Sequence, residues 1–117
     1  MRRKPYAING TISERTLLTG NNWVSGQAAT IGYNITADAL SNSITNVLDN
    51  SWLNVDGRLN ANSGSLFRFG TSGRLNMYGS LNAVGTTFTS ANAGVPWTGI
   101  TIATGVALNT FSSSIIK

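Results

Sequence analysis

The sequence contains no cysteine, no histidine and only four acidic residues. Without cysteine there is no disulfide and no thiol nucleophile, and without histidine the most common general base and metal ligand is missing. Carbohydrate-cleaving enzymes built from stacked strands place carboxylates on neighbouring turns, for acid–base chemistry or for calcium. No two of the carboxylates fall in one column of the repeat described below. We therefore expect no enzyme activity, no catalytic residue, no metal and no cofactor.

Charge of either sign is scarce as well, since only 10% of the residues are charged, compared with about 25% in a typical domain. The net charge is +4, and three of the eight basic residues stand together at positions 2–4. A nucleic-acid-binding face needs clustered basic residues. Arg58, Arg68 and Arg74 are instead scattered along the chain, so we expect no nucleic-acid partner.

Long apolar runs are also absent. No stretch approaches the roughly 20 residues of a membrane-spanning helix, so no membrane span is expected. Residues 2–4 look like the charged start of a signal peptide, but the following "PYAINGTIS" supplies no apolar core. No signal peptide is therefore recognisable.

What the chain does contain is glycine, uncharged polar residues and 41% hydrophobic residues, a composition typical of an all-β protein with many turns. "LNVDGRLNA" (53–61) recurs as "LNMYGSLNA" (75–83), with six of nine letters identical at a step of 22 residues. Apolar residues alternate within each copy, which predicts short strands with one buried face. Gly57 and Gly79 separate two strands in each copy. An antiparallel sandwich would also have short strands but gives no reason for this identity.

The 22-residue step extends in both directions if three residues are inserted in the loop "SANAGVP". The predicted inward columns are Ile31–Leu53–Leu75–Ile100, Tyr33–Val55–Met77–Ile102 and Ala37–Leu59–Leu81–Val106, with Leu108 aligned to Ala83. One such repeat cannot bury its own apolar row, whereas stacked repeats can. We therefore predict an all-β, single-domain parallel β-solenoid (β-helix) of about four coils over residues 31–117. Residues 1–30 lack the repeat and are predicted to form an N-terminal cap or arm.

Asparagines recur at the same step. Asn54 lies one repeat before Asn76, and Asn60 lies one repeat before Asn82, with Asp38 one repeat earlier still. Side-chain amides stacked in this way can hydrogen-bond along the column, and we expect these asparagines to face outward or into turns. The alternative interpretation is a polar row that binds a ligand.

The segments "GRLNMYGSLNAVGTTFTS" and "PWTGITIATG" resemble right-handed parallel β-helix repeat segments of large bacterial and archaeal extracellular surface proteins. The usual pattern of those segments, L-x-V-x-G-x-L-x-A-x-G-T, matches residues 75–86. The F-T-S that follows matches residues 88–90, and W-x-G-I-x-I matches residues 97–102. The resemblance implies that these positions serve the fold, and it implies an extracellular or cell-surface location.

Two functions remain as hypotheses. The first is a structural protein that self-associates end to end into a homo-oligomer or filament, because the last strand-like segment has no proline, glycine or charge cluster to protect its edge. The residues predicted to contact the neighbouring copy are Ile115, Ile116, Leu108, Trp23, Leu17 and Leu18. The alternative is a glycan-binding, adhesin-like module, with Trp52, Tyr78 and Trp97 as the candidate glycan contacts.

Overall fold

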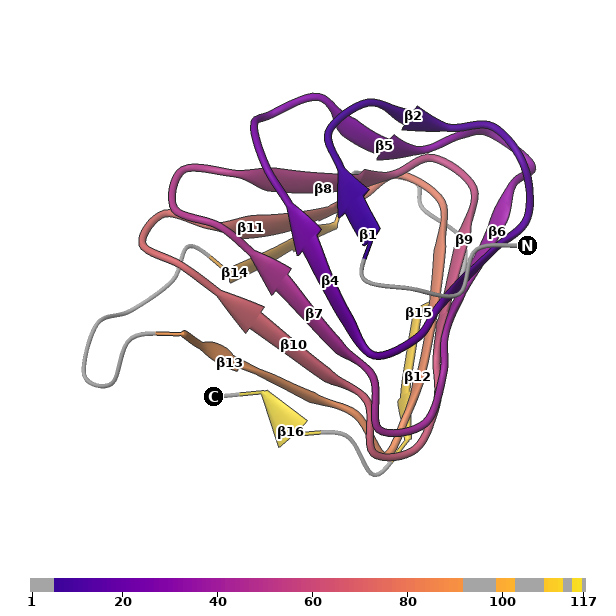
Figure 1. Cartoon of the computed structure of the whole chain (residues 1–117). Helices are drawn as coiled ribbons and strands as arrows, with labels where there is room; N and C mark the ends of the chain where they lie inside the picture. The colour runs from indigo at the N-terminus through magenta and orange to yellow at the C-terminus, as the bar shows by residue number, and fades with distance from the viewer. Residues whose placement is uncertain (1–5, 92–98, 103–108, 113–114, 117) are drawn as a thin grey trace.

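A computed structural model describes residues 6–91, 99–102, 109–112 and 115–116, which form three parallel β-sheets (Figure 1). Sheet A contains β1 (Tyr6–Ile8), β4 (Asn21–Val24), β7 (Ile44–Val47), β10 (Leu66–Phe69), β13 (Thr87–Ser90) and β16 (Ile115–Ile116). Sheet B contains β2 (Thr11–Ile12), β5 (Ala29–Ile31), β8 (Trp52–Val55), β11 (Arg74–Met77) and β14 (Gly99–Ile102). Sheet C contains β3 (Thr16–Leu18), β6 (Thr36–Ala39), β9 (Arg58–Ala61), β12 (Ser80–Val84) and β15 (Asn109–Ser112).

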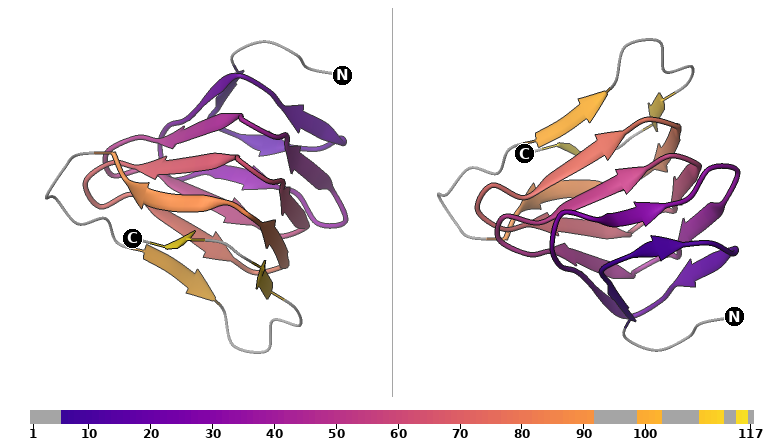
Figure 2. Two further views of the ribbon diagram at one scale, coloured as in Figure 1. Left: turned by 90° about the horizontal axis from the view of Figure 1, so that it is seen from below. Right: turned by 90° about the horizontal axis from the view of Figure 1, so that it is seen from above.

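Successive strands enter the three sheets in rotation, so that each turn of the chain adds one strand to each sheet. Figure 1 shows the sheets as the sides of a triangular body, and Figure 2 shows the turns stacked along its axis. Strands β4 to β15 make four turns, the shorter strands β1 to β3 add a turn at the N-terminal end, and β16 begins another. The predicted all-β parallel solenoid is confirmed.

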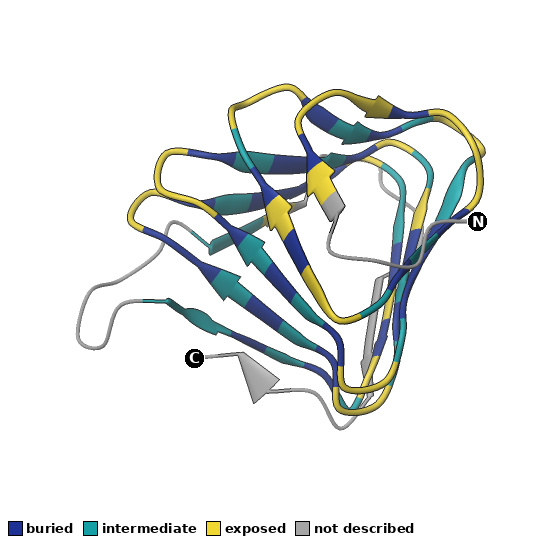
Figure 3. Ribbon diagram, in the orientation of Figure 1, coloured by how far each residue is buried: buried dark blue, intermediate teal, exposed yellow. Residues whose placement is uncertain are grey.

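The interior is filled by the alternate residues of every strand, which appear as dark blue bands in Figure 3. All six leucine, valine and methionine side chains of the two quoted repeats are buried, as predicted: Leu53, Val55, Leu59, Leu75, Met77 and Leu81. In sheet A, Phe67 stacks on Phe88 with ring centroids 5.3 Å apart. Offset aromatic stacking of this kind adds to the stabilisation from burial.

The glycine of each repeat is explained by the sharp corner between sheets B and C. β8 is joined to β9, and β11 to β12, by two residues only, Asp56–Gly57 and Tyr78–Gly79. These corners stack so closely that a Cβ on Gly79 would lie less than 3.0 Å from the carbonyl oxygen of Gly57. A Cβ on Gly57 would come equally close to the carbonyl oxygens of Gly32 and Ile35. Only glycine allows this approach of backbone to backbone.

The predicted register was wrong at the start of the repeat. Leu53 lies opposite Ala29 and Val55 opposite Ile31, a step of 24 residues, rather than opposite Ile31 and Tyr33. The corner between β5 and β6 has four residues, 32–35, where the next corner has two. The two extra residues carry Tyr33 out of the column, and its side chain is 78% exposed.

A second register error lies near the C-terminus. Ile100 and Ile102 pair with Leu75 and Met77 at the predicted step of 25 residues. In sheet C, however, Asn109 lies opposite Leu81 and Phe111 opposite Ala83, a step of 28. The sequence had assigned those places to Val106 and Leu108, which lie outside the described residues. The additional residues fall between β14 and β15.

The N-terminal segment was expected to be a cap or arm over residues 1–30. Its described part contributes strands to all three sheets, since β1 pairs with β4, β2 with β5 and β3 with β6. Ile8, Ile12 and Leu18 extend the apolar interior into this first turn. From Tyr6 onward the segment therefore continues the stack and covers the end of the next turn with strands of its own.

Candidate functional site

The three predicted glycan contacts do not form a site within the described residues. Trp52, at the start of β8, is partly buried, and the guanidinium of Arg74 lies 4.7 Å from the centroid of its indole ring. Tyr78 is exposed but follows the last residue of β11, four residues or about 13 Å along the strand from the position opposite Trp52. Trp97 lies outside the described residues.

The residues predicted to mediate self-association are distributed over different parts of the molecule. Leu18 is fully buried in the interior, whereas its neighbour Leu17 points outward from β3 and is partly exposed. Ile115 and Ile116 form β16, which pairs with Thr87 and Phe88 of β13. Leu108 lies outside the described residues.

Trp23, the remaining predicted self-association residue, lies on the lateral face of sheet A. It pairs with Ala7 of β1 and Asn46 of β7, so it belongs to the second turn and not to the end of the stack. Its side chain is 38% exposed. Its position therefore favours contact with something beside the solenoid rather than with a copy stacked on its end.

The asparagine columns form hydrogen-bonded ladders on the outer faces of sheets B and C. Asn76 Nδ2 donates to Asn54 Oδ1 (2.9 Å), and Asn54 Nδ2 donates to the carbonyl oxygen of Ala29 (3.2 Å). Asn60 Nδ2 donates to Asp38 Oδ1 (2.9 Å). The predicted stacking is confirmed. Asn76 is nonetheless buried, although we expected it to face outward or into a turn.

The sequence gave no reason to pair Arg15 with Asp38. The Arg15 guanidinium donates two hydrogen bonds to Asp38 Oδ2, from Nη2 (2.7 Å) and from Nε (3.1 Å). Asp38 thus connects the first turn to the ladder of sheet C. All the groups of both ladders bind one another or the backbone, which fits a role in stability rather than in ligand binding.

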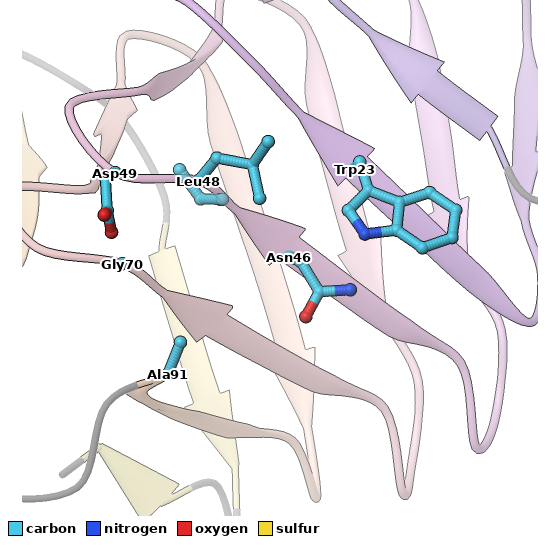
Figure 4. Close-up of a pocket in the computed structure, with 7 residues that line it drawn as sticks. Trp23, Asn46, Leu48, Asp49, Gly70 and Ala91 are labelled. Carbon is cyan, nitrogen blue, oxygen red and sulfur yellow. The ribbon is translucent and has the colours of Figure 1, made fainter.

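The largest hollow described on the surface is a groove of about 430 Å³, lined by Trp23, Asn46, Val47, Leu48, Asp49, Gly70 and Ala91. We call it the sheet A groove. Figure 4 shows its residues following the ends of β7, β10 and β13, with the Trp23 ring on β4 at one side. Sequence reasoning missed it because Trp23 had been placed in the cap and the corner residues carried no recognisable motif.

The N-terminal end of the stack has a different character. The carbonyl oxygens of Ile8, Ile12 and Leu18 accept hydrogen bonds from the next turn, each at 3.0 Å. Successive residues of a strand direct their backbone groups to opposite sides. The N–H and C=O groups of Ala7, Thr11 and Leu17 therefore point along the axis toward the free edge. In the described chain no strand lies beyond β1, β2 or β3.

Comparison with known proteins adds no identification, because no protein-family model, curated protein or solved structure matches the chain. Within the described ranges, no group of three or more acidic, histidine or cysteine residues could hold a metal ion. The same part of the chain contains no helix long and apolar enough to cross a membrane.

Proposed function

We propose that the protein is a non-enzymatic structural subunit that self-associates end to end into an extracellular fibre or surface assembly. The observation that supports this proposal best is the free edge shared by β1, β2 and β3, the last described strands of the three sheets at one end. Ala7, Thr11 and Leu17 together direct three N–H donors and three C=O acceptors along the axis. Unpaired edges of this kind are templates for another strand.

The two ends of the described stack are complementary because every sheet is parallel. β16, β14 and β15 are the last strands of sheets A, B and C at the C-terminal end, and a second copy placed there would present β1, β2 and β3 in the same rotation. The contact joins two different surfaces of the subunit, so it repeats without closing and produces a filament.

The edge strands also lack most of the usual protection against such pairing. Proteins commonly blunt an edge with proline, lysine or a bulge, and β1, β2 and β3 contain neither proline nor lysine. Their shortness weakens each edge taken singly, but the three edges act together in one interface.

The test removes the outward N–H groups without disturbing the inner ladder. Proline has no N–H and is tolerated at edge positions whose N–H faces solvent. The double variant Ala7→Pro, Leu17→Pro should sediment as a smaller species than the intact chain, with an unchanged far-UV circular dichroism spectrum. The control is Ala7→Val, Leu17→Val, which keeps both N–H groups and should assemble like the intact chain. Negative-stain imaging of the same samples shows whether the larger species are filaments.

A second arm addresses the other end. Lysine at both Ile115 and Ile116 places two like charges on β16, and it should likewise reduce the size of the assembly. The proposal is refuted if the intact chain sediments as a monomer at high concentration, or if the proline variant assembles as well as the valine control.

A further inference from the structure

The sheet A groove lies on the side of the solenoid, away from the edges used in the proposed assembly. Its volume of about 430 Å³ falls within the range of about 300–1,000 Å³ typical of small-molecule sites. Trp23, Asn46 and Val47 come from neighbouring strands, and Leu48, Asp49, Gly70 and Ala91 come from the corners that follow those strands. The groove thus needs only described residues, and all of them are held by the parallel ladder.

The apolar part of the groove is a flat aromatic face with an aliphatic neighbour. The Trp23 side chain is 38% exposed and the Leu48 side chain 42% exposed, and Figure 4 shows them on either side of Asn46. Both are among the few large apolar side chains that the described chain leaves in contact with solvent. An exposed indole of this kind offers a surface on which a ligand ring can stack.

The polar part of the groove is rich in hydrogen-bond acceptors. Asn46 uses its Nδ2 to bind the carbonyl oxygen of Asn22 (3.2 Å), which fixes the amide and leaves Oδ1 as an acceptor. Asp49 Oδ1 accepts a hydrogen bond from the N–H of Thr71 (2.8 Å), which fixes the carboxylate and leaves Oδ2 without a partner among the described residues. The Trp23 indole N–H is the matching donor.

We infer that the sheet A groove binds a neutral carbohydrate. A sugar ring has an apolar C–H face that can lie against the indole of Trp23, and it has hydroxyl groups that can donate to Asn46 Oδ1 and Asp49 Oδ2. Both acceptors are held in place before binding, so little conformational freedom is lost when the ligand arrives.

Other ligand classes fit the groove less well. An anion such as phosphate needs positively charged or N–H donors, whereas none of the lining residues is basic and one is a carboxylate. A quaternary ammonium ion is normally enclosed by several aromatic faces, whereas Trp23 is the one aromatic residue among those lining the groove.

The inference is tested with the full chain by affinity electrophoresis in native gels run with reversed polarity, because the protein is basic. Separate gels contain galactomannan, xyloglucan or mixed-linkage β-glucan as neutral probes and polygalacturonate as an acidic probe. We expect retardation by at least one neutral polymer. Trp23→Ala should weaken that binding about tenfold or more, as expected when an aromatic anchor is removed, and Trp23→Phe should retain most of it. Asp49→Asn keeps an acceptor oxygen and should retain partial binding, whereas Asp49→Ala should not.

The matched control is Tyr78→Ala, which removes an exposed aromatic residue from a different corner and should bind like the intact chain. Circular dichroism of each variant shows that the fold is kept. The inference is overturned by absence of retardation in all three neutral polymers, by retardation in polygalacturonate alone, or by neutral binding that Trp23→Ala leaves unchanged. It is also overturned if tetramethylammonium, and no sugar polymer, quenches the tryptophan fluorescence of the intact chain.

Discussion

Replacing Gly79 by alanine is the sharpest test of the way the turns stack. The added Cβ would lie 2.5 Å from the carbonyl oxygen of Asp56 and 2.8 Å from its carbonyl carbon, and it would come even closer to the carbonyl oxygen of Gly57. All three atoms belong to the backbone, so no side chain can rotate away to make room. The corner of one turn must instead move away from the corner of the next.

That movement disturbs three hydrogen bonds of the same corner. The N–H groups of Tyr78 and Gly79 both donate to the carbonyl oxygen of Val55 (2.9 and 2.7 Å), and the N–H of Ser80 donates to that of Gly57 (2.9 Å). Each contributes about 1 kcal/mol net, and overpacking itself costs about 1–3 kcal/mol. We therefore expect Gly79→Ala to lower the free energy of unfolding by about 3–5 kcal/mol, which corresponds to a fall in Tm of about 10–20 °C for a domain of this size.

The assay is unfolding in urea or by heating, followed by far-UV circular dichroism. Gly10→Ala is the matched control, because a Cβ on Gly10 meets nothing within 4 Å and its φ is not in the left-handed region. Such a change is neutral or stabilises by up to about 1 kcal/mol through the unfolded chain. If Gly79→Ala is no more destabilising than Gly10→Ala, the close stacking of the corners is refuted.

Two further substitutions test the core and the ladder of sheet C. Leu75→Ala should lower the free energy of unfolding by about 2–5 kcal/mol because it opens a cavity in a fully buried column; in the same urea titration Leu48→Ala, at an exposed position, should change it by less than about 0.5 kcal/mol, and equal effects would contradict the inward register. Asp38→Ala should cost about 1–3 kcal/mol by leaving the amide of Asn60 without its acceptor. Arg15→Ala should cost less than about 1 kcal/mol, since the Arg15 side chain is 70% exposed, and an Arg15 effect as large as that of Asp38 would show that the ion pair outweighs the ladder.

The candidate site shows where sequence reasoning ends. Trp23 stood out in the sequence, but its neighbours in the groove are Asn46, Asp49, Gly70 and Ala91, which come from three successive turns and share no motif. Trp52 looked equally suited to bind a sugar, yet Arg74 covers its ring. Whether an aromatic side chain is free depends on the residue one turn away, which the periodic pattern does not specify.

The sequence by itself determined the kind of architecture. Alternating apolar residues, a 22-residue step and a glycine at the same place in two repeats are sufficient to predict stacked parallel turns, because each turn needs its neighbours to bury its apolar row. The same step predicted the contacts between Asn54 and Asn76 and between Asp38 and Asn60.

Only the tertiary structure decided the register at both ends of the repeat, the pairing of Arg15 with Asp38 and the position of Trp23 beside a groove. The physical reason is that a corner of a solenoid can hold two residues or four, as the corners at 56–57 and 32–35 do. Such a difference shifts the pairing of every strand before the corner and leaves the alternation within each strand unchanged. Local alternation therefore predicts which residues face inward, whereas the lengths of the corners decide which residues meet.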